Sequence, residues 1–91
     1  MYSIFSTSQF KKDLKKAQKS GLDIKELKSV INCLARGEEL DVKYRDHLLT
    51  GNYKGYRECH IRPDWLLIYK IEANKLLLVL QRTGSHSELF N

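Results

Sequence analysis

The segment YRECHIRPDWLLIY, at residues 56–69, most constrains the fold of this chain because it reads as a β-hairpin. Its residues favour strands on both sides of Pro63, and side chains of a strand alternate between the two faces. Pro63 cannot donate a backbone hydrogen bond to a sheet, so it interrupts the run. We therefore predict one strand up to Ile61, a connection at Ile61–Asp64 and a second strand over residues 65–71.

A third apolar run, KLLLVLQR at residues 75–82, follows a second tight turn and extends the hairpin to three antiparallel strands. If that turn is centred between residues 73 and 74, Trp65 faces Arg82 on the neighbouring strand. If the first hairpin is centred near Pro63, His60 lies opposite Trp65 or one residue away. The registers therefore predict a row of His60, Trp65 and Arg82 across one end of the sheet.

The N-terminal half carries two helical patterns. The first helix is expected to begin with a capping box of Ser6 and Gln9 and to end at Gly21. The second is expected to run from Asp23 to Gly37. Apolar residues recur three or four positions apart in both: Phe10, Leu14 and Ala17, then Ile24, Leu27, Val30, Ile31 and Leu34. We therefore expect an α+β fold, with two N-terminal helices packed on a small twisted antiparallel sheet.

The remaining segments carry weaker signals. Residues 1–5 are expected to form a short strand at the edge or the centre of the sheet, and residues 38–55 an irregular loop. A loop of that length in a small protein is often functional. The length and the lack of a linker or repeat predict a single domain over residues 1–91.

Lysines concentrate on the first predicted helix of a basic chain. The formal net charge is +5 and the sequence pI is about 9.3, which favours a polyanionic partner. The helix carries lysines at positions 11, 12, 15, 16 and 19. Such a run is often only a solvated face, but Lys11 and Lys15 are candidates for contact with nucleic-acid phosphates.

Cysteine spacing and hydropathy argue against several classes of protein. Cys33 and Cys59 form no C-x-x-C pair, which argues against a structural zinc site and against a secreted disulfide scaffold. Cys59 and His60 do not suit a nucleophile and its base, because neighbours on a strand point to opposite faces. The sequence shows no signal peptide and no apolar run as long as a membrane helix needs, so we expect a cytoplasmic protein without a membrane partner.

Five side chains become candidates for one catalytic site if Leu89 and Phe90 dock the C-terminal tail: His47, His60, Asp64, Arg82 and His86. Cleavage of RNA through its own 2′-hydroxyl requires a base, an acid and a cation for the phosphate. Histidines suit the first two tasks and arginine suits the third. Trp65 is suited to stack on an unpaired base. This route requires neither a metal nor a cofactor.

These residues also have purely structural interpretations. His60 can be a satisfied strand histidine, and Asp64 a turn residue. Trp65 can belong to the core, and Arg82 can pair with Glu58. The other two histidines can be solvated loop and tail residues. The catalytic interpretation therefore depends on the joint placement of all of them.

A set of motifs from residue 46 onward occurs in the order and spacing of a known family. The motifs are Asp46-His47, Gly51, Lys54-Gly55-Tyr56-Arg57, His60, Pro63-Asp64-Trp65, Leu67-Ile68-Tyr69-Lys70, Arg82-Thr83-Gly84, His86 and Leu89-Phe90. With them the sequence resembles the YafQ toxins of type II toxin–antitoxin systems, in the RelE superfamily. The N-terminal half agrees in helical layout with less residue identity. Glu58-Cys59 and the turn at residues 72–74 depart from the family pattern, which leaves codon preference open.

The resemblance implies a RelE-like α+β fold and a ribosome-dependent endoribonuclease that cuts mRNA in the ribosomal A site without a metal. It implies partners as well: the 70S ribosome, mRNA and a cognate DinJ-like antitoxin. The toxin would be a monomer when free and a hetero-oligomer with its antitoxin. Arg82 would stabilise the transition state, and Trp65 and Phe90 would hold the substrate or the tail.

The resemblance also assigns the proton transfers. His86 would be the general acid, and the work of the base would be shared by Asp64, His60 and His47. Two other functions remain open: a non-enzymatic RNA- or ribosome-binding or regulatory module, and a metal-dependent nuclease that uses the same four side chains as ligands. Arg82 is an unfavourable neighbour for a bound cation, which argues against the second of these.

Overall fold

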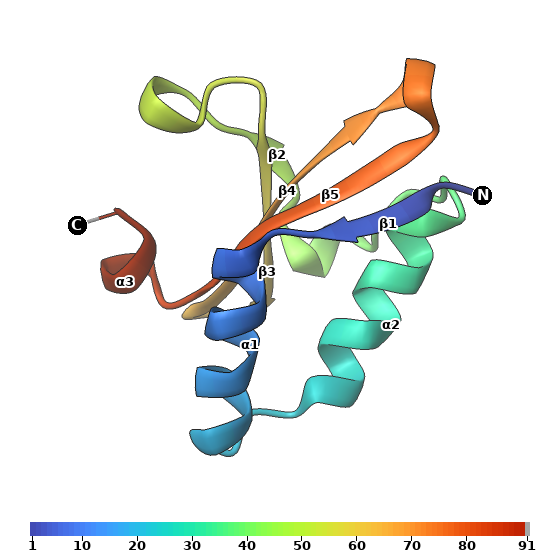
Figure 1. Cartoon of the computed structure of the whole chain (residues 1–91). Helices are drawn as coiled ribbons and strands as arrows, with labels where there is room; N and C mark the ends of the chain where they lie inside the picture. Colours follow the sequence, from blue (N-terminus) through green and yellow to red (C-terminus); the bar gives the residue numbers. More distant parts are fainter. Residues whose placement is uncertain (91) are drawn as a thin grey trace.

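Five strands form one sheet in the computed structural model, which describes residues 1–90 (Figure 1). The strand order is β1-β5-β4-β3-β2, with β1 at Ser3–Ser6, β2 at His47–Leu48, β3 at Arg57–Arg62, β4 at Trp65–Glu72 and β5 at Leu77–Gly84. β1 runs parallel to β5, and the other neighbours are antiparallel. The predicted antiparallel centre of three strands is confirmed, and the N-terminal segment is an edge strand.

Helices α1 (Ser8–Lys19) and α2 (Ile24–Ala35) cover one face of the sheet (Figure 1). Their apolar stripes join the sheet in one buried cluster. The sheet contributes seven buried residues to it: Cys59, Ile61, Trp65, Leu67, Tyr69, Leu78 and Leu80. The predicted α+β class, with two N-terminal helices on a sheet, is confirmed. Within residues 1–90, no helix is both long and apolar enough to cross a membrane.

Most helix ends follow the signals in the sequence. Asp23 caps α2, because its side chain accepts a hydrogen bond from the backbone N–H of Lys25 at 3.0 Å. Gly21 and Gly37, just after the two helices, have φ angles of +81° and +76°. Glycine adopts this left-handed conformation without steric strain, so both predicted stops are confirmed.

The cap of α1 lies one residue later than predicted. Thr7 is the N-cap, and its Oγ1 accepts a hydrogen bond from the N–H of Phe10 at 2.9 Å and donates one to the carbonyl of Gln81 at 2.8 Å. Ser6 instead belongs to β1, where it pairs with Leu80. The prediction that Ser6 caps the helix is therefore wrong, because strand pairing with β5 takes precedence over the local capping pattern.

The second face of the sheet is covered only in part. Leu66 and Ile68 point to this side and pack with Leu89 of the short helix α3 (His86–Phe90). Three partly buried side chains of the loop before β3 border this cluster: Leu49, Tyr53 and Tyr56. Leu89 therefore docks the C-terminal segment, as predicted. Because α3 is short, the part of this face beside it is not covered by a helix and stays open (Figure 1).

The segment over residues 38–55 is more regular than the loop expected. It contains two 3-10 turns and the two-residue strand β2. Asp46 anchors the segment, because its carboxylate accepts hydrogen bonds from the hydroxyl of Tyr69 at 2.5 Å and from Nε of Arg57 at 3.1 Å. His47, next to this anchor, therefore lies at the edge of the sheet.

The register between β4 and β5 differs from the predicted one. A 3-10 turn followed by Leu76 at a φ of +50° makes the connection longer than a tight hairpin turn. A β-bulge after Ile68 shifts the pairing again. Arg82 consequently pairs with Ile68 and not with Trp65. The predicted row of His60, Trp65 and Arg82 is therefore wrong.

Replacing Thr7 with alanine is expected to lower the free energy of unfolding by about 1 to 2 kcal/mol, because α1 loses its cap and a contact with β5. The matched control Ser6→Ala is expected to change it by less than about 0.5 kcal/mol. Urea unfolding followed by circular dichroism measures both values. Equal losses in the two variants would contradict the assignment of the cap to Thr7.

Candidate active site

A row of paired residues crosses the open face of the sheet from β2 to β5. His47 pairs with Glu58, Glu58 with Ile68, and Ile68 with Arg82. Paired residues share a face of the sheet. Along the row, Ile68 therefore lies between the polar residues of β2 and β3 and Arg82 of β5. His60 lies two positions along β3 from Glu58, on the same face. Strands β3 and β5 are two strand spacings apart, or roughly 10 Å, so imidazoles and a guanidinium flank an apolar floor.

One buried carboxylate holds both histidines at the β3 side. Oε1 of Glu58 lies 3.5 Å from Nε2 of His47 and 3.2 Å from Nε2 of His60, and the two rings are 6.2 Å apart. The side chain of Glu58 is 6% exposed, whereas those of His47 and His60 are 50% and 22% exposed. The acid is therefore inside the protein, and the imidazoles are at its surface.

The two histidine rings have similar partners. Nδ1 of His47 lies 2.7 Å from the carbonyl of Arg45, and Nδ1 of His60 lies 3.3 Å from the carbonyl of Pro63. Each ring therefore faces a carbonyl with one nitrogen and Glu58 with the other. A neutral imidazole has one N–H and can donate to one of these two acceptors, whereas a protonated imidazole can donate to both. Such a cluster can exchange protons with a bound substrate.

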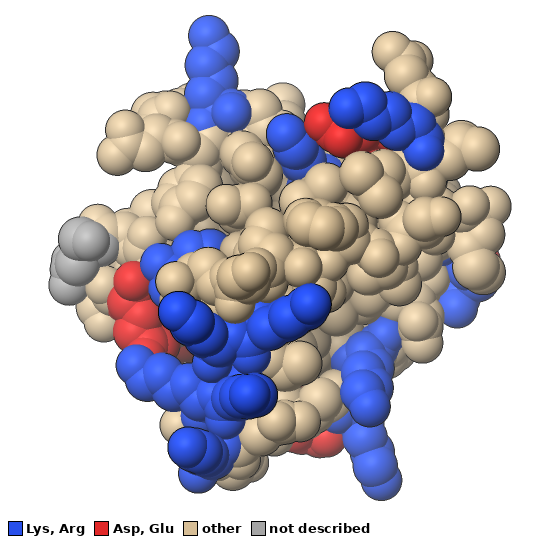
Figure 2. Space-filling view, viewed as in Figure 1, with Lys and Arg blue, Asp and Glu red and all other residues tan. Residues whose placement is uncertain are grey.

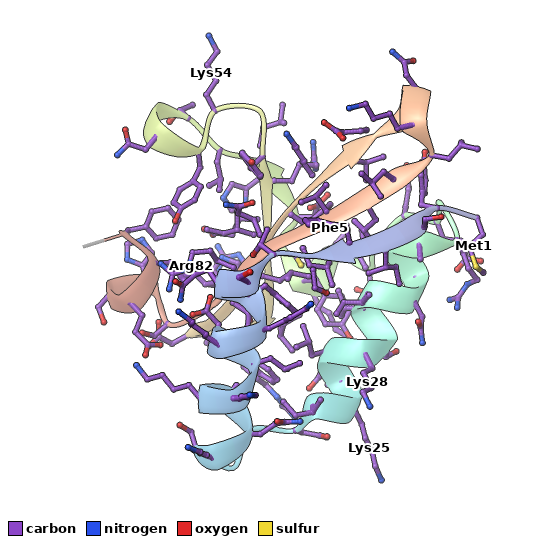
Figure 3. The ribbon with its side chains drawn as sticks, viewed as in Figure 1. Met1, Phe5, Lys25, Lys28, Lys54 and Arg82 are labelled. Carbon is purple, nitrogen blue, oxygen red and sulfur yellow. The ribbon has the colours of Figure 1, made fainter. Side chains whose placement is uncertain are left out.

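An acid of α1 holds Arg82 at the β5 side. Nε and Nη2 of Arg82 each donate a hydrogen bond to the carboxylate of Asp13 at 3.0 Å. The hydrogen bonds to Asp13 raise the pKa of Arg82 above the ordinary arginine value, so the side chain stays cationic. Arg82 lies between α1 and α3 (Figure 3). It is 25% exposed, which leaves part of the guanidinium accessible to a phosphate.

His86 stands on α3 at the rim of the open face. The backbone N–H of His86 donates to Oδ1 of Asp64 at 3.1 Å, which ties α3 to the turn between β3 and β4. The exposed imidazole stacks on the ring of Phe90 at 4.8 Å, and Phe90 meets Tyr53 edge-on at 5.6 Å. The structure thus brings His86 together with Asp64 and Phe90, across the floor from the other two histidines.

The short helix α3 is held by its own cap and by α1. The N–H of Ser85 donates to the carboxylate of Glu88 at 2.8 Å, and the N–H of Glu88 donates to Oγ of Ser85 at 3.3 Å. This reciprocal arrangement is a capping box. Lys16 forms an ion pair with the same carboxylate, and its hydrogen bond lowers the pKa of Glu88 to about 2. Lys16 therefore links α1 to α3 through an ion pair at the surface.

Two residues near the hairpin lie on the helix side of the sheet. Trp65 is 2% exposed, and its Nε1 donates to Oγ1 of Thr83 at 3.0 Å. This burial favours the core interpretation of Trp65 over stacking on a base. Cys59 is fully buried, and burial raises the pKa of its thiol. His60 points to the other face, so the two neighbours do not form a nucleophile and its base.

Basic side chains gather over α1, and Figure 2 shows them as a cluster at the lower left of the molecule. The five lysines of this helix are all exposed: Lys11, Lys12, Lys15, Lys16 and Lys19. Lys16 is taken up by its ion pair with Glu88. Lys11 and Lys15 therefore remain the candidates for phosphate contact that the sequence indicates.

The arrangement of ligand-type side chains does not favour a metal centre. Within residues 1–90, no group of three or more His, Cys, Asp or Glu side chains is arranged to hold a metal ion. His47 and His60 gather at Glu58, whereas His86 lies on α3 with Asp64. The four-ligand site considered from the sequence is therefore not assembled.

Two acids that support the site are not singled out by the sequence analysis. Glu58 enters it as a possible partner of Arg82 and as a departure from the family motifs, and the structure pairs Arg82 with Asp13 instead. Asp13 carries a recognisable signal, because it stands three residues after Phe10 and four before Ala17, on the buried stripe of α1. A carboxylate at a buried position requires a partner, so the pattern predicts a partner for Asp13 elsewhere in the fold.

Comparison with known proteins shows which family this chain resembles. The family model for a bacterial toxin of type II toxin–antitoxin systems, YafQ, matches residues 2–91. A curated relative, the mRNA interferase toxin YafQ of Escherichia coli K12, is 44% identical over 85 residues, which cover 92% of this chain and 90% of that protein. The family match extends over the elements that carry the candidate site.

Solved structures show the same fold. A metal-bound toxin from Helicobacter pylori is 48% identical and superimposes with a TM-score of 0.94, covering 99% of this chain and 100% of that one. A chain of the E. coli DinJ-YafQ complex is 42% identical and has a TM-score of 0.91, with full coverage of both chains. The agreement includes the helical N-terminal half, where the sequence motifs are weaker.

The lowered pKa of Glu88 predicts an acid dependence of stability. The ordinary pKa is 4.5 and the folded-state pKa is about 2, so this contribution is present above pH 4.5 and is lost as the pH falls toward 2. Glu88→Gln is expected to flatten the loss of stability over that range, by about 1 kcal/mol at most because the pair is partly exposed. Urea midpoints between pH 5 and 2, with Glu39→Gln as the control, measure the effect. A curve for Glu88→Gln as steep as that of the wild type would contradict the assignment.

Proposed function

The chain belongs to the YafQ family of type II toxins, and on that premise we propose that it is an endoribonuclease that cuts mRNA in the ribosomal A site. The observation that supports this proposal most directly is the placement of proton-transfer groups on both sides of an apolar floor. His47 and His60 lie at the β3 side, and His86 lies on α3 after β5. An acid and a base on opposite sides of a phosphate are what cleavage through a 2′-hydroxyl requires.

In the proposed mechanism, one of the two histidines at Glu58, His47 or His60, takes the proton of the 2′-hydroxyl. The 2′-oxygen attacks the adjacent phosphorus, and His86 donates a proton to the departing 5′-oxygen. Arg82 stabilises the additional charge on the phosphate oxygens through the part of its guanidinium that stays accessible. The products are a 2′,3′-cyclic phosphate and a 5′-hydroxyl.

Other side chains hold the site or the substrate. Asp64 fixes the start of α3 and so the position of His86. Phe90 is 38% exposed beside the imidazole, and we assign it the role of contacting a nucleotide of the mRNA. We retain Trp65 only as a support for this region from within the core, since its ring is buried.

We further propose that the chain acts as one toxin domain in the cytoplasm and binds a cognate DinJ-like antitoxin. The DinJ-YafQ complex of E. coli, whose toxin chain matches this one over its full length, supports that partner. The proposed toxin is a monomer when free and a hetero-oligomer with its antitoxin. The ribosome would contact the basic surface of α1 through Lys11 and Lys15.

A non-enzymatic module that blocks the ribosome is the alternative. Primer extension on a reporter mRNA, translated in a purified system, separates the two functions. The wild-type protein is expected to produce new 5′ ends only when ribosomes are present. His86→Ala is expected to reduce their formation by about 10²- to 10⁴-fold, because the general acid is lost. Ser87→Ala, on the same helix, is the matched control.

Inhibition of translation without new 5′ ends, unchanged in His86→Ala, would favour the binding module. The metal-bound H. pylori toxin makes a metal arm necessary in this experiment. We propose a metal-independent reaction, so cleavage is expected to persist in EDTA when magnesium is supplied only as ribosomes require. A loss of cleavage that added zinc or copper restores would overturn that part of the proposal.

The basic surface of α1 is tested by charge reversal. Lys11→Glu with Lys15→Glu is expected to weaken 70S ribosome binding at moderate salt by at least about tenfold, since two phosphate contacts become repulsive. Lys25→Glu with Lys28→Glu is the matched control, because these lysines project from α2 away from α3 (Figure 3). Sedimentation with ribosomes measures both. Equal binding by the two double variants would remove the assignment.

A further inference from the structure

We propose that Asp13 is a positioning residue for the cleavage reaction, acting through Arg82. This inference rests on the proposed function, in which Arg82 stabilises the phosphate. It assigns to helix α1 a part in catalysis that differs from the ribosome contact of its exposed lysines.

The carboxylate of Asp13 is fully engaged inside the protein. It accepts hydrogen bonds from Nε and Nη2 of Arg82 at 3.0 Å each, from the backbone N–H of Thr83 at 3.2 Å and from Nε2 of Gln9 at 3.0 Å. Only 8% of its side chain is exposed. With both oxygens occupied, Asp13 has no capacity left for a substrate, so its effect on the reaction passes through Arg82.

The same contacts fix the plane of the guanidinium. A two-point contact between a carboxylate and the Nε–Nη2 edge is possible for arginine and not for lysine. The third contact, from the N–H of Thr83, ties the carboxylate to the strand that carries Arg82. Asp13 and β5 therefore hold the side chain in one orientation before a substrate arrives.

The donors that Asp13 leaves free belong to the accessible side of Arg82. A guanidinium has five N–H groups, and Asp13 occupies two of them. Arg82 lines a hollow of about 370 Å³ beside α3, together with Tyr53, Leu89 and Phe90. Up to three N–H groups thus remain for Tyr53 and for a phosphate beside Phe90. Preorganised donors stabilise a transition state more than mobile ones, because no reorganisation is needed during the reaction.

A purely structural role makes a different prediction. If the ion pair only joins α1 to β5, its loss lowers the folded fraction and reduces ribosome binding and cleavage together. If Asp13 positions Arg82, its loss lowers the cleavage rate of the bound complex and leaves binding unchanged. The effect should also vanish when Arg82 is already absent.

The experiment compares Asp13→Asn, Arg82→Ala and the double variant in single-turnover cleavage on mRNA-programmed ribosomes. Asp23→Asn, at the N-cap of α2, is the matched control for the loss of a negative charge, because asparagine retains the capping oxygen. Asp13→Asn is expected to lower the rate at saturating ribosomes by about 10- to 100-fold, with unchanged affinity. In the Arg82→Ala background, the same change is expected to have no further effect.

A spectroscopic measurement tests the clamp without activity. The Nε–H resonance of Arg82 in the free protein is expected to shift and to exchange faster with water in Asp13→Asn. If Asp13→Asn fails to fold, Asp13→Glu replaces it in both measurements. Asp13→Glu keeps the negative charge and moves the carboxylate by one methylene. It is expected to show a shifted resonance and reduced cleavage.

The outcomes separate this inference from the proposed function. Impaired cleavage in Arg82→Ala with normal rates in folded Asp13→Asn or Asp13→Glu overturns the positioning role alone. Additive losses in the double variant also overturn it. No ribosome-dependent cleavage by the wild type, or full activity of Arg82→Ala, overturns the assigned function of Arg82 and the inference with it.

Discussion

Strand β4 is buried on both faces, and the rest of the molecule follows from that constraint. All residues from Trp65 to Tyr69 are buried, although they alternate between the two faces. A strand that is apolar on both sides must be covered on both. Helices α1 and α2 cover one side, whereas α3 supplies chiefly Leu89 to the other. The polar groups at the border of this incomplete cover stay accessible, and they form the candidate active site.

Carboxylates hold the side chains of the candidate site, although basic residues outnumber acidic ones in this chain. The chain has 11 acidic and 16 basic residues, yet an acid holds each functional group in place. Glu58 serves the two histidines of β2 and β3, Asp13 serves Arg82, and Asp64 fixes the helix of His86. These acids thus set the orientation of the groups that they hold, and the exposed lysines make the surface of α1 basic.

The sequence predicts most elements and only part of their pairing. Hydrophobic periodicity and the signals at Asp23, Gly21 and Gly37 locate the helices, because these are local properties of the chain. The register of β5 depends on a left-handed residue at Leu76 and on a β-bulge, which the strand pattern does not reveal. A local capping pattern at Ser6 fails for a similar reason, because a distant strand takes that residue.

The candidate site shows the same limit. Alternation places His60 and Glu58 on one face, and the family motifs indicate His86 and Arg82. Alternation alone does not show which face the helices cover, so the burial of Trp65 had to come from the three-dimensional structure. The partner of Arg82 is equally hidden, since 69 residues separate it from Asp13.

That separation has a consequence for how the protein folds. The helices and the β3–β4 hairpin need contacts only between near neighbours in sequence, whereas Thr7 meets Gln81 across 74 residues. Closing so large a loop costs chain entropy and slows folding. The bond between Arg82 and Asp13 belongs to the same long-range set. A chain in which only the helices and this hairpin have formed therefore lacks the contact that orders Arg82, because that contact joins the two ends of the chain.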